Sequence, residues 1–154
     1  MVWPERVVLG IIGRRPDELS LVWAVGLAWR WQTRLRVVAG YSPPIATGYH
    51  VVTAHEMQAA REHARQRVGA RIREAVAELP TPIDVDLTLV TFNQLDHELI
   101  RQGRQADLAL FSIVPTGLFA GRQRTRARRI AGRLTCPVSL GPGQAVEPVG
   151  LGSA

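Results

Sequence analysis

The chain has 154 residues, of which 46% are hydrophobic and 21% are charged. This length is typical of one domain, and the composition is neither that of a disordered nor that of a fibrous protein. The formal net charge of +6 comes from arginine alone, because the sequence contains no lysine. A basic chain favours anionic partners such as nucleotides, nucleic acid or acidic proteins, without choosing among them.

The sequence offers no segment that would place it in a membrane or send it out of the cell. Its longest apolar run, residues 21–29, falls well short of the roughly 20 residues that a membrane span requires. The first residues have neither the basic and apolar regions nor the cleavage site of a secretory signal. Cys136 is the only cysteine, so no intramolecular disulfide can form. We therefore expect a cytoplasmic protein.

The first part of the chain alternates apolar runs with a helical pattern. Residues 6–13 are a short apolar run, which predicts a buried strand. Pro16 and Asp17 mark the start of a helix that we expect to end near Gln32. A second strand follows at residues 35–41, and this spacing implies a right-handed crossover between parallel neighbours.

A long irregular connection, residues 42–52, leads to the second helix. Thr53 and Glu56 have the spacing of a capping box, which predicts that the helix begins there. Apolar residues then recur at helical spacing as far as Leu79, and Pro80 ends the pattern. A connection of this length is often part of a site.

The second half of the chain continues the alternation and then loses its pattern. We expect a strand at 83–92, a helix from its cap Asn93 to Gly103, a strand at 108–114, a basic helix at 127–134 and a strand at 137–140. The last residues are rich in glycine and proline and show no periodicity. The sequence therefore predicts a single domain over residues 1–141 and a flexible tail over residues 142–154.

Five strands alternating with four helices predict an α/β fold. The expected architecture is a three-layer α/β/α open sheet of five parallel strands, in the Rossmann-like order 3-2-1-4-5. Ligands of such sheets bind at the carboxyl ends of the strands, where the strand order reverses. The loops after the first and fourth strands are therefore the places to look for a site.

The order and spacing of these elements resemble the universal stress protein family, whose fold is of the adenine nucleotide alpha hydrolase-like kind. The resemblance spans residues 5–141 and rests on VVLGIIG at 7–13 with the helix after it, ADLALF at 106–111 and TCPVSL at 135–140. It implies a non-catalytic binding or regulatory protein.

The resemblance also implies how the protein assembles. Members of the family commonly form homodimers by pairing the last strands of two subunits. Here that edge would be Pro137, Val138, Ser139 and Leu140. An apolar edge strand left unpaired is a liability in solution, so we expect a homodimer.

ATP-binding members carry an aspartate at the end of the first strand and the motif G-x2-G-x9-G-[ST] after the fourth. The glycines let backbone N–H groups approach the phosphates, and the hydroxyl adds a hydrogen bond. In this chain the aspartate position is Ile12. Counting on from the fourth strand, the motif positions fall on Ser112, Pro115, Thr125 and Arg126. We therefore do not expect ATP binding of the standard family kind.

The register of the loop at 112–126 stays open. Counting backward from Pro137 places the Gly-Ser pair on Arg124 and Thr125, which preserves one hydroxyl but no glycine. Arginines at 14, 122, 124 and 126 could still surround an anion, because charge-assisted contacts to phosphate are strong. The alternative is that the arginines over 122–133 form only a solvated helix face.

The candidate ligand-binding residues, all placed by these counts, are Ile12, Gly13, Arg14, Ser112, Thr116, Gly117, Arg122, Arg124, Thr125 and Arg126. A nucleotide site requires Ser112, Thr116 and Gly117 to face an open cavity. If Leu118 and Phe119 plug that cavity instead, the protein is better explained as a scaffold.

The sequence contains no recognisable catalytic or metal-binding pattern. It has no nucleophile elbow, zinc signature or P-loop, so we expect no enzyme activity. His50, His55 and His63 lack a carboxylate or cysteine at familiar ligand spacing, so we interpret them as surface residues and expect no metal site.

Two functional hypotheses follow. The first is a dimeric regulatory or scaffold protein with no cofactor, which acts through a protein partner. The alternative is a sensor of a nucleotide (ATP, AMP or cyclic AMP) or of another small anion, through a rebuilt arginine-lined site. Nucleic-acid binding by the basic helix is not expected, because that helix lacks interleaved aromatic residues and recognition motifs.

Overall fold

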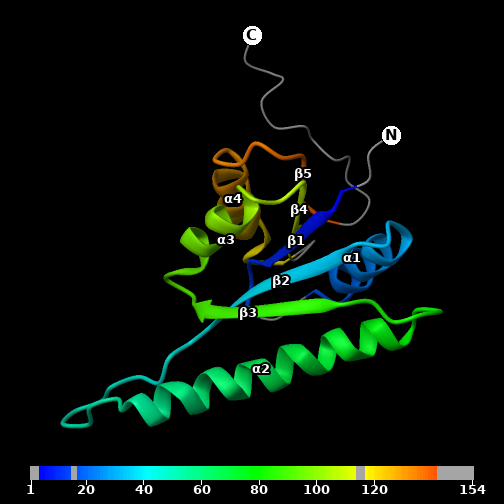
Figure 1. Ribbon diagram of the computed structural model, residues 1–154. Coiled ribbons are helices and arrows are strands. Elements are labelled where there is room, and N and C mark those ends of the chain that lie inside the picture. The colour runs from blue at the N-terminus through cyan, green and yellow to red at the C-terminus, as the bar shows by residue number, and fades with distance from the viewer. Residues whose placement is uncertain (1–3, 15–16, 114–116, 142–154) are drawn as a thin grey trace.

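The computed structural model describes residues 4–14, 17–113 and 117–141. They form one five-stranded parallel sheet in the order β3-β2-β1-β4-β5, with helices on both faces (Figure 1). This confirms the predicted three-layer α/β fold and its strand order. Thr116 and the tail at 142–154 lie outside the described residues.

The central strand of the sheet is β1. It pairs in parallel with β2 on one side, where Val7 lies opposite Leu35, and with β4 on the other, where Val7 lies opposite Leu108. Both faces of these strands are covered, which is why their sequences are nearly continuous apolar runs. The strands are β1 (Arg6–Ile11), β2 (Arg34–Tyr41), β3 (Val85–Thr91), β4 (Leu108–Ser112) and β5 (Val138–Ser139).

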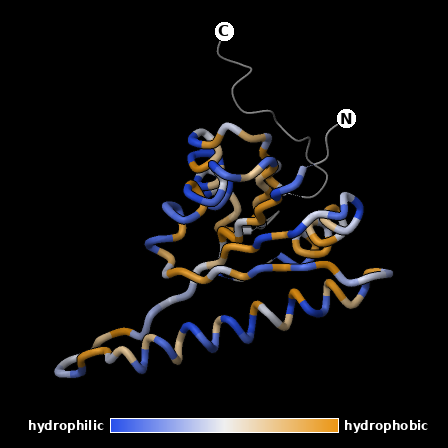
Figure 2. Tube along the Cα trace, in the orientation of Figure 1, coloured by the Kyte–Doolittle hydropathy of each residue, from blue (hydrophilic) through white to orange (hydrophobic). Residues whose placement is uncertain are grey.

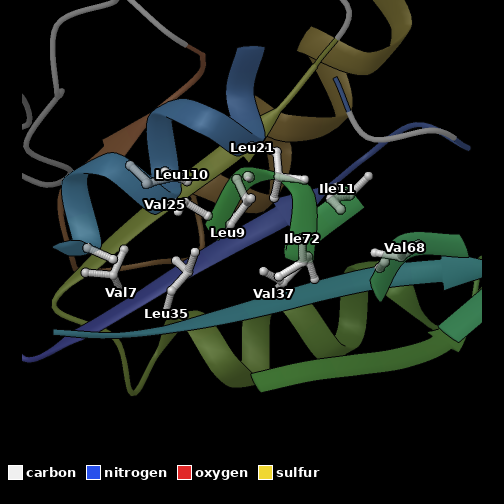
Figure 3. Close-up of a cluster of buried hydrophobic side chains, with 14 of the residues drawn as sticks. Val7, Leu9, Ile11, Leu21, Val25, Leu35, Val37, Val68, Ile72 and Leu110 are labelled. Atoms are coloured by element: carbon white, nitrogen blue, oxygen red, sulfur yellow. The ribbon is translucent and has the colours of Figure 1, made fainter. Parts of the chain in front are cut away.

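Helices α1 (Glu18–Arg30) and α2 (Ala54–Ala77) cover one face of the sheet. Both begin where a side chain caps them: Asp17 accepts from the backbone N–H of Ser20, and Thr53 from that of Glu56. Figure 3 shows the first core cluster between these helices and the strands. Its labelled members are Val7, Leu9, Ile11, Leu21, Val25, Leu35, Val37, Val68, Ile72 and Leu110.

Helices α3 (Leu95–Gly103) and α4 (Ala120–Ala131) cover the other face. The second core cluster lies there and includes Val8, Val38, Leu99, Phe111 and Ile130. The two clusters use alternate residues of the same strands, because successive side chains of a strand point to opposite faces. Within the described ranges, none of the helices has the length and apolarity of a membrane span.

The loop at 42–53 and the first part of α2 extend beyond the carboxyl edge of the sheet (Figure 1). We call residues 42–63 the arm. The first fully buried side chain of α2 is Ala64, and the hydrophilic and hydrophobic residues of the helix alternate along its whole length (Figure 2). Ile45, Tyr49 and Val51 of the arm are exposed. The arm therefore has little contact with the core, to which Ala60 contributes a partly buried side chain.

Three local predictions were wrong. The basic helix α4 begins at Ala120 rather than at residue 127. The residues before Ala127 are helical although they lack the apolar face from which a helix is predicted. Helix α3 has Gln94 at its N-cap with no side-chain hydrogen bond, so Asn93 does not cap it. Strand β5 is also shorter than the predicted 137–140.

Candidate functional site

A cavity of about 710 Å³ opens at the carboxyl edge of the sheet. Its walls come from the loops that follow β1, β2 and β3 and from the start of α4. We call it the carboxyl-edge cavity. It is lined by Ile12, Gly13, Arg14, Ser42, Phe92, Phe119, Arg122, Gln123 and Arg126. This is the edge of the sheet at which ligands of open α/β folds bind.

The three arginines of the cavity differ in whether the protein already binds their guanidinium groups. Arg126 is held by the protein: its Nε donates to Asp96 Oδ1 at 2.6 Å, and one terminal nitrogen donates to the Phe92 carbonyl oxygen at 3.1 Å. Arg14 and Arg122 are exposed, and among the described residues neither has an ion-pair or hydrogen-bond partner for its guanidinium. They are therefore the residues that can bind an anion there without breaking an existing contact.

A second, adjoining cavity of about 330 Å³ shares Arg14, Ser42 and Phe92 with the first. Its remaining wall is α2, which contributes His63 and Arg67. Sequence reasoning did not select Phe92, Ser42 or Arg67. Phe92 directly follows β3 and Ser42 directly follows β2, so their positions at the ends of predicted strands could have identified them. Arg67 lies at the site only because of the path that α2 takes over the sheet.

Ile12 and Gly13 follow β1, where ATP-binding universal stress proteins carry their aspartate. The Ile12 side chain is only 3% exposed and packs in the second core cluster, although the residue borders the cavity. A Cβ added to Gly13 would lie 2.8 Å from the Gln123 side-chain nitrogen. The Gln123 amide of α4 therefore occupies the space directly over Gly13.

Two other predicted site residues form hydrogen bonds inside the fold. The buried Ser112 hydroxyl accepts from the backbone N–H of Asp17 at 3.0 Å, which ties the end of β4 to the cap of α1. The Thr125 hydroxyl donates to the Gly121 carbonyl oxygen at 2.9 Å, one turn back in α4. Arg124 and Gly117 do not line the carboxyl-edge cavity. Pro115 and Thr116 lie outside the described residues.

Leu118 and Phe119 do not close the cavity. Leu118 is 90% exposed and lies outside the cavity wall, whereas Phe119 is 58% exposed and forms part of that wall. Phe119 and Phe92 both border the cavity, so its lining combines aromatic rings with arginines. Such a lining suits a ligand that has both a planar apolar group and an anionic group.

The beginning of α4 adds a favourable potential for anions. Phe119 is the N-cap residue and supplies no side-chain hydrogen bond, and the first turn contains no acidic residue. The first N–H groups of a helix lack acceptors within the helix and form the positive end of its dipole. Together with Arg14 and Arg122, this helix start makes the mouth of the cavity electropositive.

The residues present do not fit the phosphate cradle of the family motif. The hydroxyl of Thr125, the residue at a motif position, already donates to a carbonyl oxygen within α4. Arg126 is bound to Asp96 and Phe92. An anion in the cavity would therefore meet Arg14 and Arg122, whose guanidinium groups have no partner among the described residues.

The described part of the chain contains no group of three or more histidine, cysteine or acidic residues that could hold a metal ion. Cys136 is buried, and burial raises the pKa of its thiol, so the reactive thiolate form is disfavoured.

Comparison with solved structures identifies the fold. A universal stress protein family structure from Burkholderia pseudomallei has a TM-score of 0.59 and 19% sequence identity, with 89% of this chain and 96% of that chain covered. The chain has the universal stress protein fold. Universal stress protein UspA from Lactobacillus plantarum gives a TM-score of 0.55 at 15% identity, covering 88% of this chain and 96% of that one.

A third structure with this fold, a universal stress protein in complex with cAMP, has a TM-score of 0.53 and 18% identity over 90% of this chain and 98% of that chain. No family model matches the sequence, and no curated protein matches it either. The universal stress protein fold is thus shared across almost the whole length of these proteins while few residues are identical.

Proposed function

We propose that the protein is a non-catalytic regulatory or scaffold protein of the universal stress protein type that does not bind ATP in the standard way of that family. The observation that carries this proposal is the Gln123 amide over Gly13, where an added Cβ would lie 2.8 Å from the Gln123 nitrogen. Gly13 directly follows the position at which ATP-binding members carry their aspartate, so a nucleotide bound in the family's way would have to displace the Gln123 side chain there. The protein fills this space with its own side chain.

A second candidate function has an observation of its own. The carboxyl-edge cavity is open, and Arg14 and Arg122 face it without an ion-pair partner among the described residues. We propose as the alternative that this cavity binds a nucleotide or a related small anion, with the base against Phe92 or Phe119 and a phosphate on the two arginines. The solved structure of a universal stress protein with cAMP supports a nucleotide as the ligand class.

A thermal-shift panel separates the two proposals. The purified protein is heated in low salt with ATP, ADP, AMP, cyclic AMP or inorganic phosphate, and co-purified ligands are identified by mass spectrometry. A specific ligand at 100 times its dissociation constant stabilises the fold by about 2.7 kcal/mol. A shift with one nucleotide supports the sensor, whereas no shift with any of them leaves the scaffold. Phosphate release from ATP at a measurable turnover rate would contradict a non-catalytic role.

Matched variants place the ligand. Arg14→Gln and Arg122→Gln each remove one charge from the cavity and should weaken nucleotide binding by about tenfold. Arg133→Gln removes the same charge from an exposed residue beyond the end of α4 and should leave the affinity unchanged. Equal affinities in all three variants would rule out the carboxyl-edge cavity as the nucleotide site.

Assembly and cellular location belong to this proposal as well. We propose a homodimer through the last strand, with a further protein partner for the scaffold role, and a cytoplasmic location. The support for the dimer is the position of β5 at the edge of the sheet. Nucleic-acid binding remains the less favoured reading, and its test is a steep loss of affinity with added salt.

A further inference from the structure

The amino edge of the sheet, opposite the carboxyl-edge cavity, gathers three arginines. Arg6 of β1 lies opposite Arg34 of β2, and Arg36 is the next residue of β2 on the same face. This face is the one covered by α3 and α4, because Val8 and Val38, which share it, belong to the second core cluster. Three guanidinium groups therefore start from neighbouring positions on one face.

These arginines line a hollow of about 500 Å³ that we call the amino-edge hollow. Its walls are the first residues of β1 and β2 and the segment around the end of α3. The lining residues are Glu5, Arg6, Val7, Val8, Arg34, Arg36, Gln102, Gln105 and Ala106. Small-molecule sites in proteins typically measure about 300–1,000 Å³, so the hollow has the size of a metabolite site.

The hollow is lined by three arginines and by one carboxylate, that of Glu5, so its lining keeps a net positive charge. Among the described residues, Arg6 and Arg36 form no ion pair. Arg34 lies 3.6 Å from Asp84 and 3.9 Å from Asp86, and the side chains of both aspartates are at least half exposed, so water screens these pairs. Arg6 and Arg34 lie opposite each other on adjacent strands, where like charges are destabilising, and a bound anion would relieve that repulsion.

Arg36 is held in place by a chain of hydrogen bonds. One terminal nitrogen donates to Gln102 Oε1 at 2.7 Å, and the Gln102 nitrogen donates to Glu98 at 2.9 Å. Gln102 is only 6% exposed. The Arg101 hydrogen bond holds the pKa of Glu98 below its ordinary value, so Glu98 is already matched by a cation of its own. Arg36 is thus fixed in orientation while its own charge is left unmatched.

We propose that the amino-edge hollow is a binding site for a small multivalent oxyanion, a phosphorylated or polycarboxylate metabolite, held by Arg6, Arg34 and Arg36. Guanidinium groups suit this ligand class because their forked donors match phosphate and carboxylate oxygens. The Gln102 contact pre-orders Arg36, which lowers the entropic cost of binding. This site is separate from the carboxyl-edge cavity and does not depend on the function proposed for it.

The test is calorimetric titration of the full chain with pyrophosphate and, separately, with citrate in low salt. Saturable binding of either anion is expected, and the stronger of the two identifies the ligand as phosphoryl or carboxylate. Arg34→Gln and Arg36→Gln should each weaken that binding by about tenfold or more. Arg34 is exposed, so Arg34→Gln should keep the fold. This holds even if Arg36→Gln destabilises the protein through loss of the contact to Gln102.

The controls are Arg61→Gln and Arg133→Gln, which remove the same charge from exposed residues that line neither the hollow nor the carboxyl-edge cavity and should leave the affinity unchanged. Nuclear magnetic resonance adds a local readout, because the Gln102 side-chain amide should shift on titration. No saturable binding of either anion at millimolar concentration would overturn the proposal. So would binding that survives both hollow variants, or that is lost in the two control variants instead.

Discussion

Gly40 and Gly26 illustrate how differently two glycines of this fold are constrained. A Cβ added to Gly40 in β2 would overlap the ring of Phe92, which lines the carboxyl-edge cavity. A Cβ added to Gly26 in α1 would meet nothing within 4 Å. Gly40 therefore lets the Phe92 ring lie against the sheet, whereas Gly26 only weakens its helix.

We expect the two alanine substitutions to have opposite signs. Gly40→Ala should lower the free energy of unfolding by about 1–3 kcal/mol, because the core side chains must move apart. Gly26→Ala should raise it by up to about 1 kcal/mol, because alanine is the better helix former. Urea denaturation of both variants measures the difference. A Gly40→Ala protein as stable as the parent would show that the Phe92 ring is not packed on β2.

Helices α3 and α4 are joined by one carboxylate. Asp96, in the first turn of α3, accepts from Arg126 at 2.6 Å and from Arg129 at 2.9 Å, and its side chain is 30% exposed. Arg126 also donates a hydrogen bond to the carbonyl oxygen of Phe92, the residue that directly follows β3. These contacts fix the position of α4 against α3 and the end of β3. They therefore help to shape the carboxyl-edge cavity, to whose wall α4 contributes.

Asp96→Asn should lower the free energy of unfolding by about 1–2 kcal/mol, because two charge-assisted hydrogen bonds are weakened in a partly buried place. The control is Glu62→Gln, which removes an exposed pair to Arg65 at 3.7 Å in α2 and should change stability by less than about 0.5 kcal/mol. Chemical denaturation at neutral pH compares them. Equal effects would mean that the Asp96 contacts are no stronger than an ordinary surface pair.

The elements that could be predicted from the sequence are those with a local chemical signal. Thr53 caps its helix as expected, and Asp17, predicted only to mark the start of α1, is its N-cap, because an N-cap bond depends only on residues within one turn. Helix α4 lacks a capping side chain, and its buried residues Ala127 and Ile130 lie in its second half, so its true start left no pattern. Gln123 lies over Gly13 only because α4 already begins at Ala120, so this contact could not be predicted from the sequence.

At the scale of the whole molecule, the feature to explain is the short edge strand β5. Its backbone meets β4 where the Ala109 N–H donates to the Pro137 carbonyl oxygen at 3.0 Å. Residues of a parallel strand face its two neighbours alternately, so Val138 directs its backbone groups away from β4. Among the described residues no strand pairs with the outer side of β5, so we expect this edge to pair with a second copy of the chain.

We therefore expect a homodimer in sedimentation experiments over a micromolar concentration series. Leu140→Arg, next to β5, should shift the equilibrium toward monomer, because a charge is placed at the proposed interface. Leu140 also packs against the second core cluster, so circular dichroism must show that this variant stays folded. Leu118→Arg changes an equally apolar residue, 90% exposed at the start of α4, and should leave the dimer intact. A parent protein that stays monomeric at every concentration would contradict the assignment of this edge.

The arm gives the molecule two levels of stability. Residues 54–63 belong to α2 by hydrogen bonding, yet the buried side chains of the helix begin only at Ala64. Unwinding this stretch breaks backbone hydrogen bonds that water can replace and exposes no fully buried side chain, so it costs far less than global unfolding. Amide hydrogens of one continuous helix should thus exchange by two routes, local opening before Ala64 and cooperative unfolding after it.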